Sequence, residues 1–520
     1  MELLYGIGFL ICFYIFQYYL QFYKKWRNGP PGPFPIPFVG NLWQLARIGG
    51  QPSTAISTLS SLYGDIFRLR VGVKDFVVMS SVDTIVDIIS RDEALARESD
   101  VGIFHDRSMG QNTGIVSAEG ETWKKNRAWT FKTLSRVGLS KISGLESNIH
   151  KQSSSIIAVW EKALSSSGMP WAEVEVSDDV MTVPFFKVVF TSVMGSDRVN
   201  DAKNGTQLNE MIHLNMENTK SLSSFAAGLD VAFPILSRII PATTGRKVQN
   251  KFHSSARRAA QSLLDDVRNE AFGSSAALGK IQGTSSLTHA FFEAMENNPS
   301  DPDFTDFHFT SIYMDLLQGS GETTSAHVQC LLLNCVTHPE WQQKIVNEIN
   351  NVIGDDELPK LEHQSRMPCT EAFMLEVHRT AILMPNLVPR RSIADFKFEE
   401  FTIPKNTLLI ADVVTAHSDP RIWKNPSEFD PSRFLLSSGK ELCPKTKRQC
   451  LPFGAGKRRC PGETIAEAMA FLFFINILRK FKLGAIAGQR PPKLRMMEGA
   501  AALPLPFKMT ITKRGKLAKI

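Results

Sequence analysis

Residues 453–462, which read F-G-A-G-K-R-R-C-P-G, constrain this chain more than any other segment. They place Cys460 in a glycine-rich turn beside an aromatic residue and a run of cations. A free thiol is mostly protonated at neutral pH, so a site that uses the thiolate needs nearby positive charge and backbone N–H groups to lower its pKa. Glycines let those backbone groups approach the sulfur. Because a thiolate is a strong ligand for haem iron, the segment predicts a metal-ligand loop, with a buried structural cysteine as the alternative.

The N-terminus predicts a membrane anchor. Residues 3–23 contain no charged side chain, and Lys24, Lys25 and Arg27 follow at once. A helix of roughly 20 apolar residues spans a bilayer, and the flanking cations favour a cytosolic position for the rest of the chain. A cleaved signal peptide is the competing interpretation, but its apolar core is usually shorter and no small-x-small cleavage site follows. We therefore expect an anchor at 1–23, a basic and proline-rich hinge at 24–40, and a catalytic domain at 41–520.

The body of the chain reads as mainly helical with a small β-rich part. Apolar residues alternate at Phe67, Leu69, Val71 and Val73, which predicts a half-buried strand. Residues 76–79 are its expected hairpin partner across 72–75. The proline-dense segment 29–37 predicts a stiff extended connection, and the Ser- and Gly-rich segment 273–286 predicts a surface loop.

Composition narrows the classes of function. With 43% hydrophobic residues the chain can bury a large core, and its net charge of +7 is not gathered into a basic tail, so no nucleic-acid partner is expected. Seven scattered cysteines fit a reducing compartment. No G-x-G-x-x-G dinucleotide signature is present, so we expect electrons for any redox chemistry to come from a partner protein.

A long helix is predicted over 305–337, and it contains Gly319, Ser320, Gly321, Glu322 and Thr323. Each glycine inside a helix costs about 1 kcal/mol relative to alanine, so a local break that opens a groove beside a ligand is expected here. An acid and a hydroxyl at such an opening suit proton delivery to bound oxygen. A capping or surface polar cluster is the alternative.

Two further pairs have helical spacing. Trp123 and Arg127 lie four residues apart, and both side chains are hydrogen-bond donors that suit a carboxylate. Glu376 and Arg379 lie three apart and share a helix face.

The pattern F-x-x-G-x-R-x-C-x-G resembles the haem-ligand loop of the cytochrome P-450 family, and the other motifs occur in that family's order over nearly the whole chain. The resemblance implies the cytochrome P-450 fold, mainly α with a small β-rich subdomain and an N-terminal transmembrane helix. It implies haem b with Cys460 as axial thiolate ligand, Glu322 and Thr323 as catalytic residues, and a brace built from Glu376, Arg379 and Arg433. Ser320 and Ser432 depart from the family pattern. The other implied cofactor-binding residues are Trp123, Arg127, Arg390, Phe453 and Arg458, with Arg391 as the alternative to Arg390.

By the same resemblance the protein is a haem-thiolate monooxygenase of the microsomal animal-type branch, anchored in the endoplasmic reticulum membrane. It would insert one oxygen atom of O2 into a lipophilic substrate (a sterol, fatty acid or xenobiotic), with electrons from NADPH–cytochrome P-450 reductase and cytochrome b5 as a further candidate donor. The reductase would dock on a basic face formed by Lys124, Lys125, Lys445, Lys447, Arg448, Lys457 and Arg459. The substrate wall would draw on 103–116, 211–240, 313–317, 386–388 and 499–503, including Phe104, Phe225 and Phe233.

Two other classes of function stay open. One is a reductase-independent haem-thiolate isomerase or dehydratase, which has no need for the Glu322–Thr323 pair. The other is a non-catalytic haem sensor or carrier.

Overall fold

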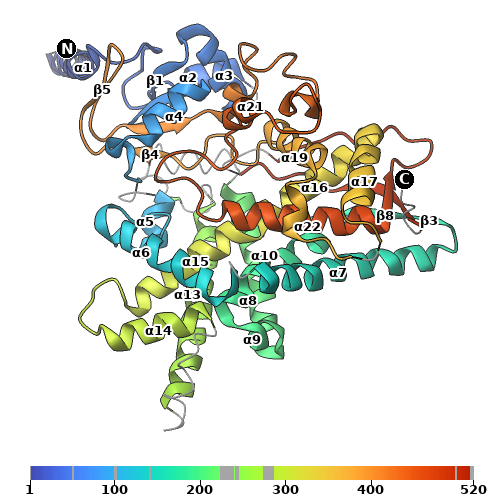
Figure 1. The fold of residues 1–520 in the computed structure, drawn as a ribbon. Helices are drawn as coiled ribbons and strands as arrows, with labels where there is room; N and C mark the ends of the chain where they lie inside the picture. The colour runs from blue at the N-terminus through green and yellow to red at the C-terminus, as the bar shows by residue number, and fades with distance from the viewer. Residues whose placement is uncertain are drawn as a thin grey trace.

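The structure is a computed structural model that describes residues 2–49, 52–98, 102–139, 142–222, 233, 239–240, 245–272, 286–355, 357–497 and 501–515. Helices dominate it (Figure 1). The α-helices are α1 (Glu2–Trp26), α2 (Leu42–Ile48), α3 (Pro52–Tyr63), α4 (Val82–Ser90), α5 (Gly102–Ser108), α6 (Gly120–Leu134), α7 (Ile142–Ser167), α8 (Asp178–Met194), α9 (Ser196–Asn200), α10 (Ala202–Leu222), α13 (Arg246–Phe272), α14 (Leu287–Asn297), α15 (Asp306–Ser320), α16 (Glu322–Thr337), α17 (Pro339–Val352), α18 (Leu361–Gln364), α19 (Pro368–Thr380), α20 (Val413–His417), α21 (Pro444–Gln449) and α22 (Glu463–Lys480). The strands are β1 (Ile66–Val71), β2 (Lys74–Met79), β3 (Trp171–Val176), β4 (Arg390–Arg391), β5 (Phe396–Phe398), β6 (Phe401–Ile403), β7 (Leu408–Ala411), β8 (Phe481–Gly484) and β9 (Phe507–Lys513).

The largest sheet has the strand order β1-β2-β7-β4 and contains the predicted hairpin. β1 and β2 pair antiparallel from Ile66 opposite Met79 to Val71 opposite Lys74. The hairpin prediction is therefore confirmed, but its assignment of Val73 to the strand is wrong. The chain already reverses at Gly72, which has a φ of 58°, so Val73 lies exposed in the turn. β7 runs parallel to β2 and carries β4 at the sheet edge.

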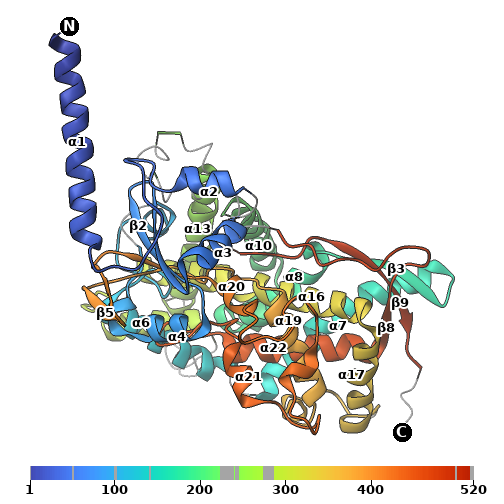
Figure 2. The same ribbon diagram turned by 90° about the horizontal axis from the view of Figure 1, so that it is seen from above.

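The main core lies among long helices away from this sheet. α8, α16 and α22 are buried along most of their length, and α7 packs on α8 and α22. β3, β9 and β8 form a second sheet at one end of the molecule, opposite the end that carries α1 (Figures 1 and 2). Because α16 and α22 pack on each other inside this core, the segment that carries Glu322 and Thr323 and the helix that follows the cysteine loop share one closely packed core.

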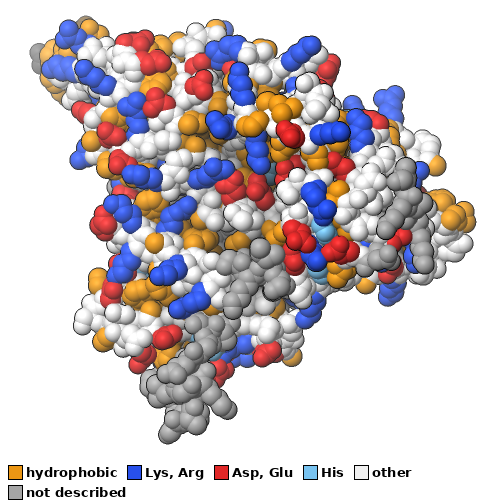
Figure 3. Space-filling view, viewed as in Figure 1, with side chains coloured by type: hydrophobic (Ala, Val, Ile, Leu, Met, Phe, Trp, Pro, Cys, Tyr) orange, Lys and Arg blue, Asp and Glu red, His pale blue; other side chains and the backbone are white. Residues whose placement is uncertain are grey.

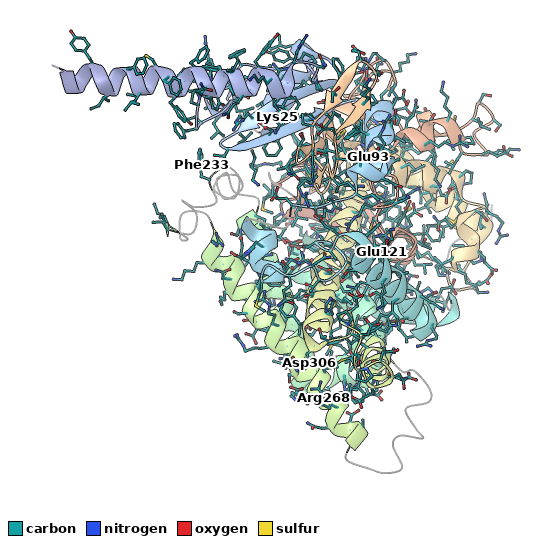
Figure 4. All side chains as sticks on the ribbon, turned by 90° about the vertical axis from the view of Figure 1, so that its left-hand side faces the viewer. Lys25, Glu93, Glu121, Phe233, Arg268 and Asp306 are labelled. Carbon is teal, nitrogen blue, oxygen red and sulfur yellow. The ribbon has the colours of Figure 1, made fainter. Side chains whose placement is uncertain are left out.

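Helix α1 projects from the body (Figure 2), and its residues Tyr5–Trp26 are long and apolar enough to cross a membrane. Its last turns, however, pack on the β1–β2 hairpin. Phe22 and Trp26 are buried, and Lys25 Nζ lies 2.7 Å from the Asp75 carboxylate; Figure 4 shows Lys25 where the helix meets the body. The proline-rich segment continues along β1, with the Arg68 N–H donating to the Pro31 carbonyl (2.7 Å).

The predicted helix over 305–337 is present but is divided in two. α15 begins after Thr305, whose side chain caps it, and α16 ends before Pro339 starts α17. The break lies at Gly321, as the glycine pattern predicted. The expected loop at 273–286 falls almost entirely outside the described residues.

Candidate active site

Backbone hydrogen bonds and two glycines shape the loop that carries Cys460. The Cys460 N–H donates to the Phe453 carbonyl at 2.9 Å, which closes the turn. Gly454 and Gly456 have φ angles of 70° and 69°, a region that only glycine adopts without strain. α22 begins shortly after the cysteine, so the sulfur lies near the N-terminal N–H groups of an 18-residue helix.

The surroundings of the sulfur act in both directions on its protonation. The Cys460 side chain has solvent-accessible surface, but many protein atoms lie close to its sulfur. This partial removal from water raises the pKa of the thiol. The Gly462 N–H, Arg127 and Arg459 lower the pKa, as the sequence predicted, but they do not outweigh burial, and Glu463 also raises it. The cations and the backbone N–H group that the sequence predicted are therefore present beside the sulfur. A metal that binds the sulfur deprotonates it directly.

Four arginines and one tryptophan gather next to this loop. The Arg458 guanidinium lies 3.9 Å from the Trp123 ring centre, and that of Arg127 lies 5.9 Å away. Burial lowers the pKa of Arg458 to about 9 and that of Arg390 to about 10, and repulsion from neighbouring arginines adds to the effect. Burial also lowers the pKa of Arg97, and repulsion from Arg390, Arg458 and Arg127 acts in the same direction. The cluster thus holds more positive charge than its own surroundings neutralise.

Hydrogen bonds orient these arginines without removing their charge. The acceptors are backbone carbonyls: Val388 and Pro389 for Arg97, Arg459 for Arg127, Ile89 and Ala455 for Arg390, and Leu95, Ile115 and Ala118 for Arg458. Arg391 differs, because its Nη2 lies 2.8 Å from both oxygens of Glu119. Of the two arginines that the sequence left undecided, Arg391 is paired with a carboxylate and Arg390 is not.

The arginine cluster fits a haem group. The indole N–H of Trp123 and the Nε of Arg97 are buried without a hydrogen-bond partner among the described residues. Unsatisfied buried donors beside excess positive charge suit the two propionate carboxylates that haem carries. Sequence reasoning missed Arg97, because no local motif marks it; the backbone bridge between Ala96 and Arg391 brings it to the site.

The predicted Glu-Arg-Arg brace is present and buried. Glu376 accepts two bonds from Arg379, at 2.7 and 2.8 Å, and one from Arg433 Nε at 3.1 Å. The Asp430 N–H also donates to Glu376 (2.9 Å). This carboxylate therefore satisfies two guanidinium groups and one backbone donor in a single buried position.

His417, which sequence reasoning missed, joins this brace to the cysteine loop. Its carbonyl accepts from Arg379 Nη1 (3.0 Å), and its ring Nε2 accepts from the Leu451 N–H (2.9 Å), two residues before Phe453. Burial, with Arg379 nearby, lowers the pKa of His417 to about 3, so the ring stays neutral and keeps its acceptor. No short motif contains this residue, and only the fold shows its role.

Phe453 is supported by two stacked imidazoles. The centres of the Phe453 and His378 rings lie 5.4 Å apart in an edge-on arrangement. The His378 ring stacks on that of His327 in α16, with ring centres 3.7 Å apart and nearly parallel planes. Burial lowers the pKa of His378 to about 3, so it packs as a neutral ring. The sequence-based interpretation of His378 as a packing residue is confirmed.

At the helix break, Glu322 and Thr323 lie side by side with different environments. Glu322 is only 3% exposed, and its Oε2 accepts from Asn215 Nδ2 (3.0 Å) and Thr219 Oγ1 (2.7 Å). Burial raises the pKa of Glu322 to about 7. Among the described residues, the Thr323 hydroxyl makes one long hydrogen bond, 3.5 Å to the Gly319 carbonyl. The pair therefore combines an acid that titrates near neutral pH with a loosely held hydroxyl.

The two glycines of this motif have different roles. A Cβ at Gly321 would overlap the Phe186 ring of α8, so close packing requires glycine there. A Cβ at Gly319 would meet nothing within 4 Å, so open space lies beside the helix at that position. The Ser320 hydroxyl, at the position that departs from the family pattern, is buried without a partner among the described residues.

The structure brings together several segments of the predicted substrate wall. Asp315 of α15 pairs with Arg107 and accepts from the N–H groups of Ile115 and Val116, which joins 103–116 to 313–317. The Ala502 N–H donates to the Leu383 carbonyl (2.8 Å), close to 386–388. Phe225, most of 223–240 and the side chain of Phe104 lie outside the described residues. Phe233 is half-buried and lies on the side of the molecule that carries α1 (Figure 4).

Ion pairs divide the seven predicted docking cations into two groups. Four are paired within the chain: Lys124 with Glu121, Lys125 with Asp301 and Asp303, Lys457 with Asp92, and Arg459 with Glu463. Lys445, Lys447 and Arg448 of α21 form no ion pair within the part of the chain that the structure describes. On the face that Figure 3 shows, basic and acidic side chains are interspersed.

Comparison with known proteins agrees with this geometry. The family described as Cytochrome P450 matches residues 30–511. Cytochrome P450 2D26 of Rattus norvegicus is 28% identical over 498 residues, which cover 95% of this chain and 94% of the relative. Cytochrome P450 2D28 of Mesocricetus auratus is 26% identical, over 99% of this chain and 100% of the relative. Probable cytochrome P450 305a1 of Drosophila melanogaster is 25% identical, over 94% of this chain and 95% of the relative. This chain therefore belongs to the cytochrome P450 family, and it is a monooxygenase that binds haem through an axial cysteine thiolate.

Proposed function

We propose that this protein inserts one oxygen atom of O2 into a lipophilic substrate, such as a sterol, fatty acid or xenobiotic, with NADPH electrons supplied by a reductase. Cys460 is the proposed axial ligand. Glu322 is the observation that carries the proposal. A carboxyl group with a pKa of about 7, buried beside the Thr323 hydroxyl, can lose and regain a proton at neutral pH. An isomerase, dehydratase or carrier has no need of such a group.

The chain holds the cofactor through the arginine cluster and the cysteine loop. Arg97, Arg127, Arg390 and Arg458, with the Trp123 indole, bind the propionates because they supply charge and unsatisfied donors. When bound, the haem supplies the iron at which dioxygen is reduced. The protein's part is to fix the thiolate loop through His417 and Phe453, and to supply protons through Glu322 and Thr323.

The reductase docks, in this proposal, on the three cations of α21. Lys445, Lys447 and Arg448 form no ion pair in the described part of the chain, whereas Lys125 Nζ lies 2.5 Å from the Asp301 carboxylate. Reversing the charge of Lys445 and Lys447 together should raise the reductase concentration needed for half-maximal rate, most strongly at low salt. Lys125→Glu is the matched control and should have a smaller effect. Cytochrome b5 is proposed to use the same face.

The N-terminal helix anchors the protein in the endoplasmic reticulum membrane with the catalytic body in the cytosol. Its length and apolar character and the cations at its end support this orientation. Protease protection of a tag at Met1 in sealed microsomes, with the body accessible, tests it. A protected body and an accessible tag would reverse the orientation.

The reaction class is tested by the spectrum under carbon monoxide of purified, haem-loaded protein. Reduction by NADPH with reductase should give the red-shifted thiolate band, as should dithionite. A band with dithionite alone would favour the isomerase or sensor. Loss of the band in Cys460→Ser, but not in Cys450→Ser, would assign the ligand, because Cys450 is a buried thiol outside the turn.

A further inference from the structure

The carboxyl group of Glu322 is held by a helix other than its own. Glu322 begins α16, but its hydrogen-bond donors among the described residues, Asn215 Nδ2 and Thr219 Oγ1, come from α10. The two donors lie four residues apart, so they share one face of α10 and reach the same oxygen, Oε2. The other oxygen, Oε1, is buried with no hydrogen-bond partner among the described residues.

We propose that Asn215 and Thr219 are positioning residues that orient the Glu322 carboxyl and thereby link the position of α10 to proton supply at the active site. The inference rests on the proposed function, because it takes Glu322 as the proton-delivering acid. With Oε2 fixed by two donors, Oε1 is the oxygen left to carry the proton. Neither Asn215 nor Thr219 needs to touch the substrate, since each acts through Glu322.

The charges around Glu322 explain why these two bonds matter. Burial is the largest influence and raises its pKa, and Asp178 of α8 raises it further. Lys220 of α10 lowers the pKa, as do the bonds from Thr219 and Asn215. Donors favour the charged carboxylate, so α10 supplies all three of the groups that keep this acid able to ionise near neutral pH.

The same helix contributes to the proposed substrate wall, whose second segment begins at Met211. Met211 and Leu214 are buried apolar residues on α10, in the turn that precedes Asn215. Hydrogen bonds weaken steeply as the donor moves away from its acceptor. A substrate that shifts α10 relative to α16 would therefore change both the orientation and the pKa of Glu322, and proton supply would depend on occupancy of the substrate site.

The experiment measures the protonation of Glu322 directly. Infrared difference spectra of the haem-loaded enzyme, recorded against pH, report the C=O stretch of the protonated carboxyl, and Glu322→Gln identifies the band by removing it. Thr219→Val keeps the shape of the side chain but removes the donor, so the pKa of Glu322 should rise by about one unit. Asn215→Ala should raise it in the same direction, and Thr219→Ser should restore the original value.

The control and the kinetic readout separate positioning from general damage. Thr191 of α8 is the control residue. Its hydroxyl donates to the carbonyl four residues earlier, that of Lys187, just as the Thr219 hydroxyl also donates to the Asn215 carbonyl. Thr191 makes no hydrogen bond to Glu322 among those that the described residues form. Thr191→Val should leave the band unchanged. Peroxide released per NADPH consumed should rise in Thr219→Val and not in Thr191→Val.

An unchanged Glu322 pKa in both Thr219→Val and Asn215→Ala would overturn the proposal. If the pKa shifts as expected but Glu322→Gln releases no more peroxide than the parent, the positioning holds and the proton-delivery role of Glu322 fails.

Discussion

Replacing Glu376 by glutamine should destabilise the protein far more than its single lost charge would on the surface. Glu376 is 0% exposed and faces the guanidinium groups of Arg379, 2% exposed, and Arg433, 10% exposed. The amide keeps one acceptor but turns an N–H group toward the arginines, so two buried cations lose their counter-charge. Removing one partner of a buried ion pair costs about 3–5 kcal/mol. Scaled by the unfolding entropy of a 520-residue chain, this lowers Tm by about 3–5 °C.

The matched control is Glu121→Gln. Glu121 and Lys124 have the same three-residue spacing and a similar separation, 2.6 Å against 2.7 Å, but their side chains are 87% and 55% exposed. Water already solvates both charges there, so the control should show no measurable change in Tm. Thermal unfolding followed by circular dichroism, with the thiolate band as a second readout of the cysteine loop, measures both variants. Equal shifts in Glu376→Gln and Glu121→Gln would refute the argument that burial makes this pair strong.

Three further predictions concern the active site. Because burial raises the pKa of Glu322 from 4.5 to about 7, the folded state favours its protonated form, so this group's contribution to stability is full below about pH 4.5 and is lost as pH rises through 7. Glu322→Gln should thus match the parent in stability at pH 4 and be more stable above pH 7, by about 3 kcal/mol of unfolding free energy at most, as thermal unfolding at both pH values would measure; a constant difference across this range would contradict the pKa. Gly321→Ala should lower stability by about 1–3 kcal/mol through overpacking. Gly319→Ala should leave stability unchanged but should weaken haem loading, because the added methyl group fills open space. Thermal unfolding and haem content measure both variants, and equal losses of stability would contradict the packing. Arg390→Gln should reduce haem retained on dilution more than Arg391→Gln does, because Arg391 is already paired with a carboxylate, and the opposite order would exchange their roles.

Local patterns were enough to locate the chemistry. The cysteine turn, the glycine-marked helix break and the Glu-Arg pair of α19 each depend on residues within about ten positions, where backbone geometry and helical spacing follow from residue type. The β1–β2 hairpin was predicted for the same reason. The one error in that prediction was also local. The chain turns at Gly72, directly after Val71, so Val73 lies in the turn and not in the strand.

Long-range packing decided what those groups experience. Burial, which depends on segments far apart in the chain, raises the pKa of Cys460 and of Glu322. The pairing of Arg391, and not of Arg390, with a carboxylate likewise depends on where Glu119 lies. His417 carries no motif, because its role comes from two contacts made by different elements.

The sequence by itself determined the family, the candidate ligand loop and the acid–alcohol pair, since these are matters of residue type and short spacing. Only the tertiary structure decided which cations are left unpaired, which donors hold the Glu322 carboxyl, and how far each titratable group is removed from water. Charge, hydrogen bonding and desolvation act through space, and the chain order of Asn215, Thr219 and Glu322 gives no sign that they meet.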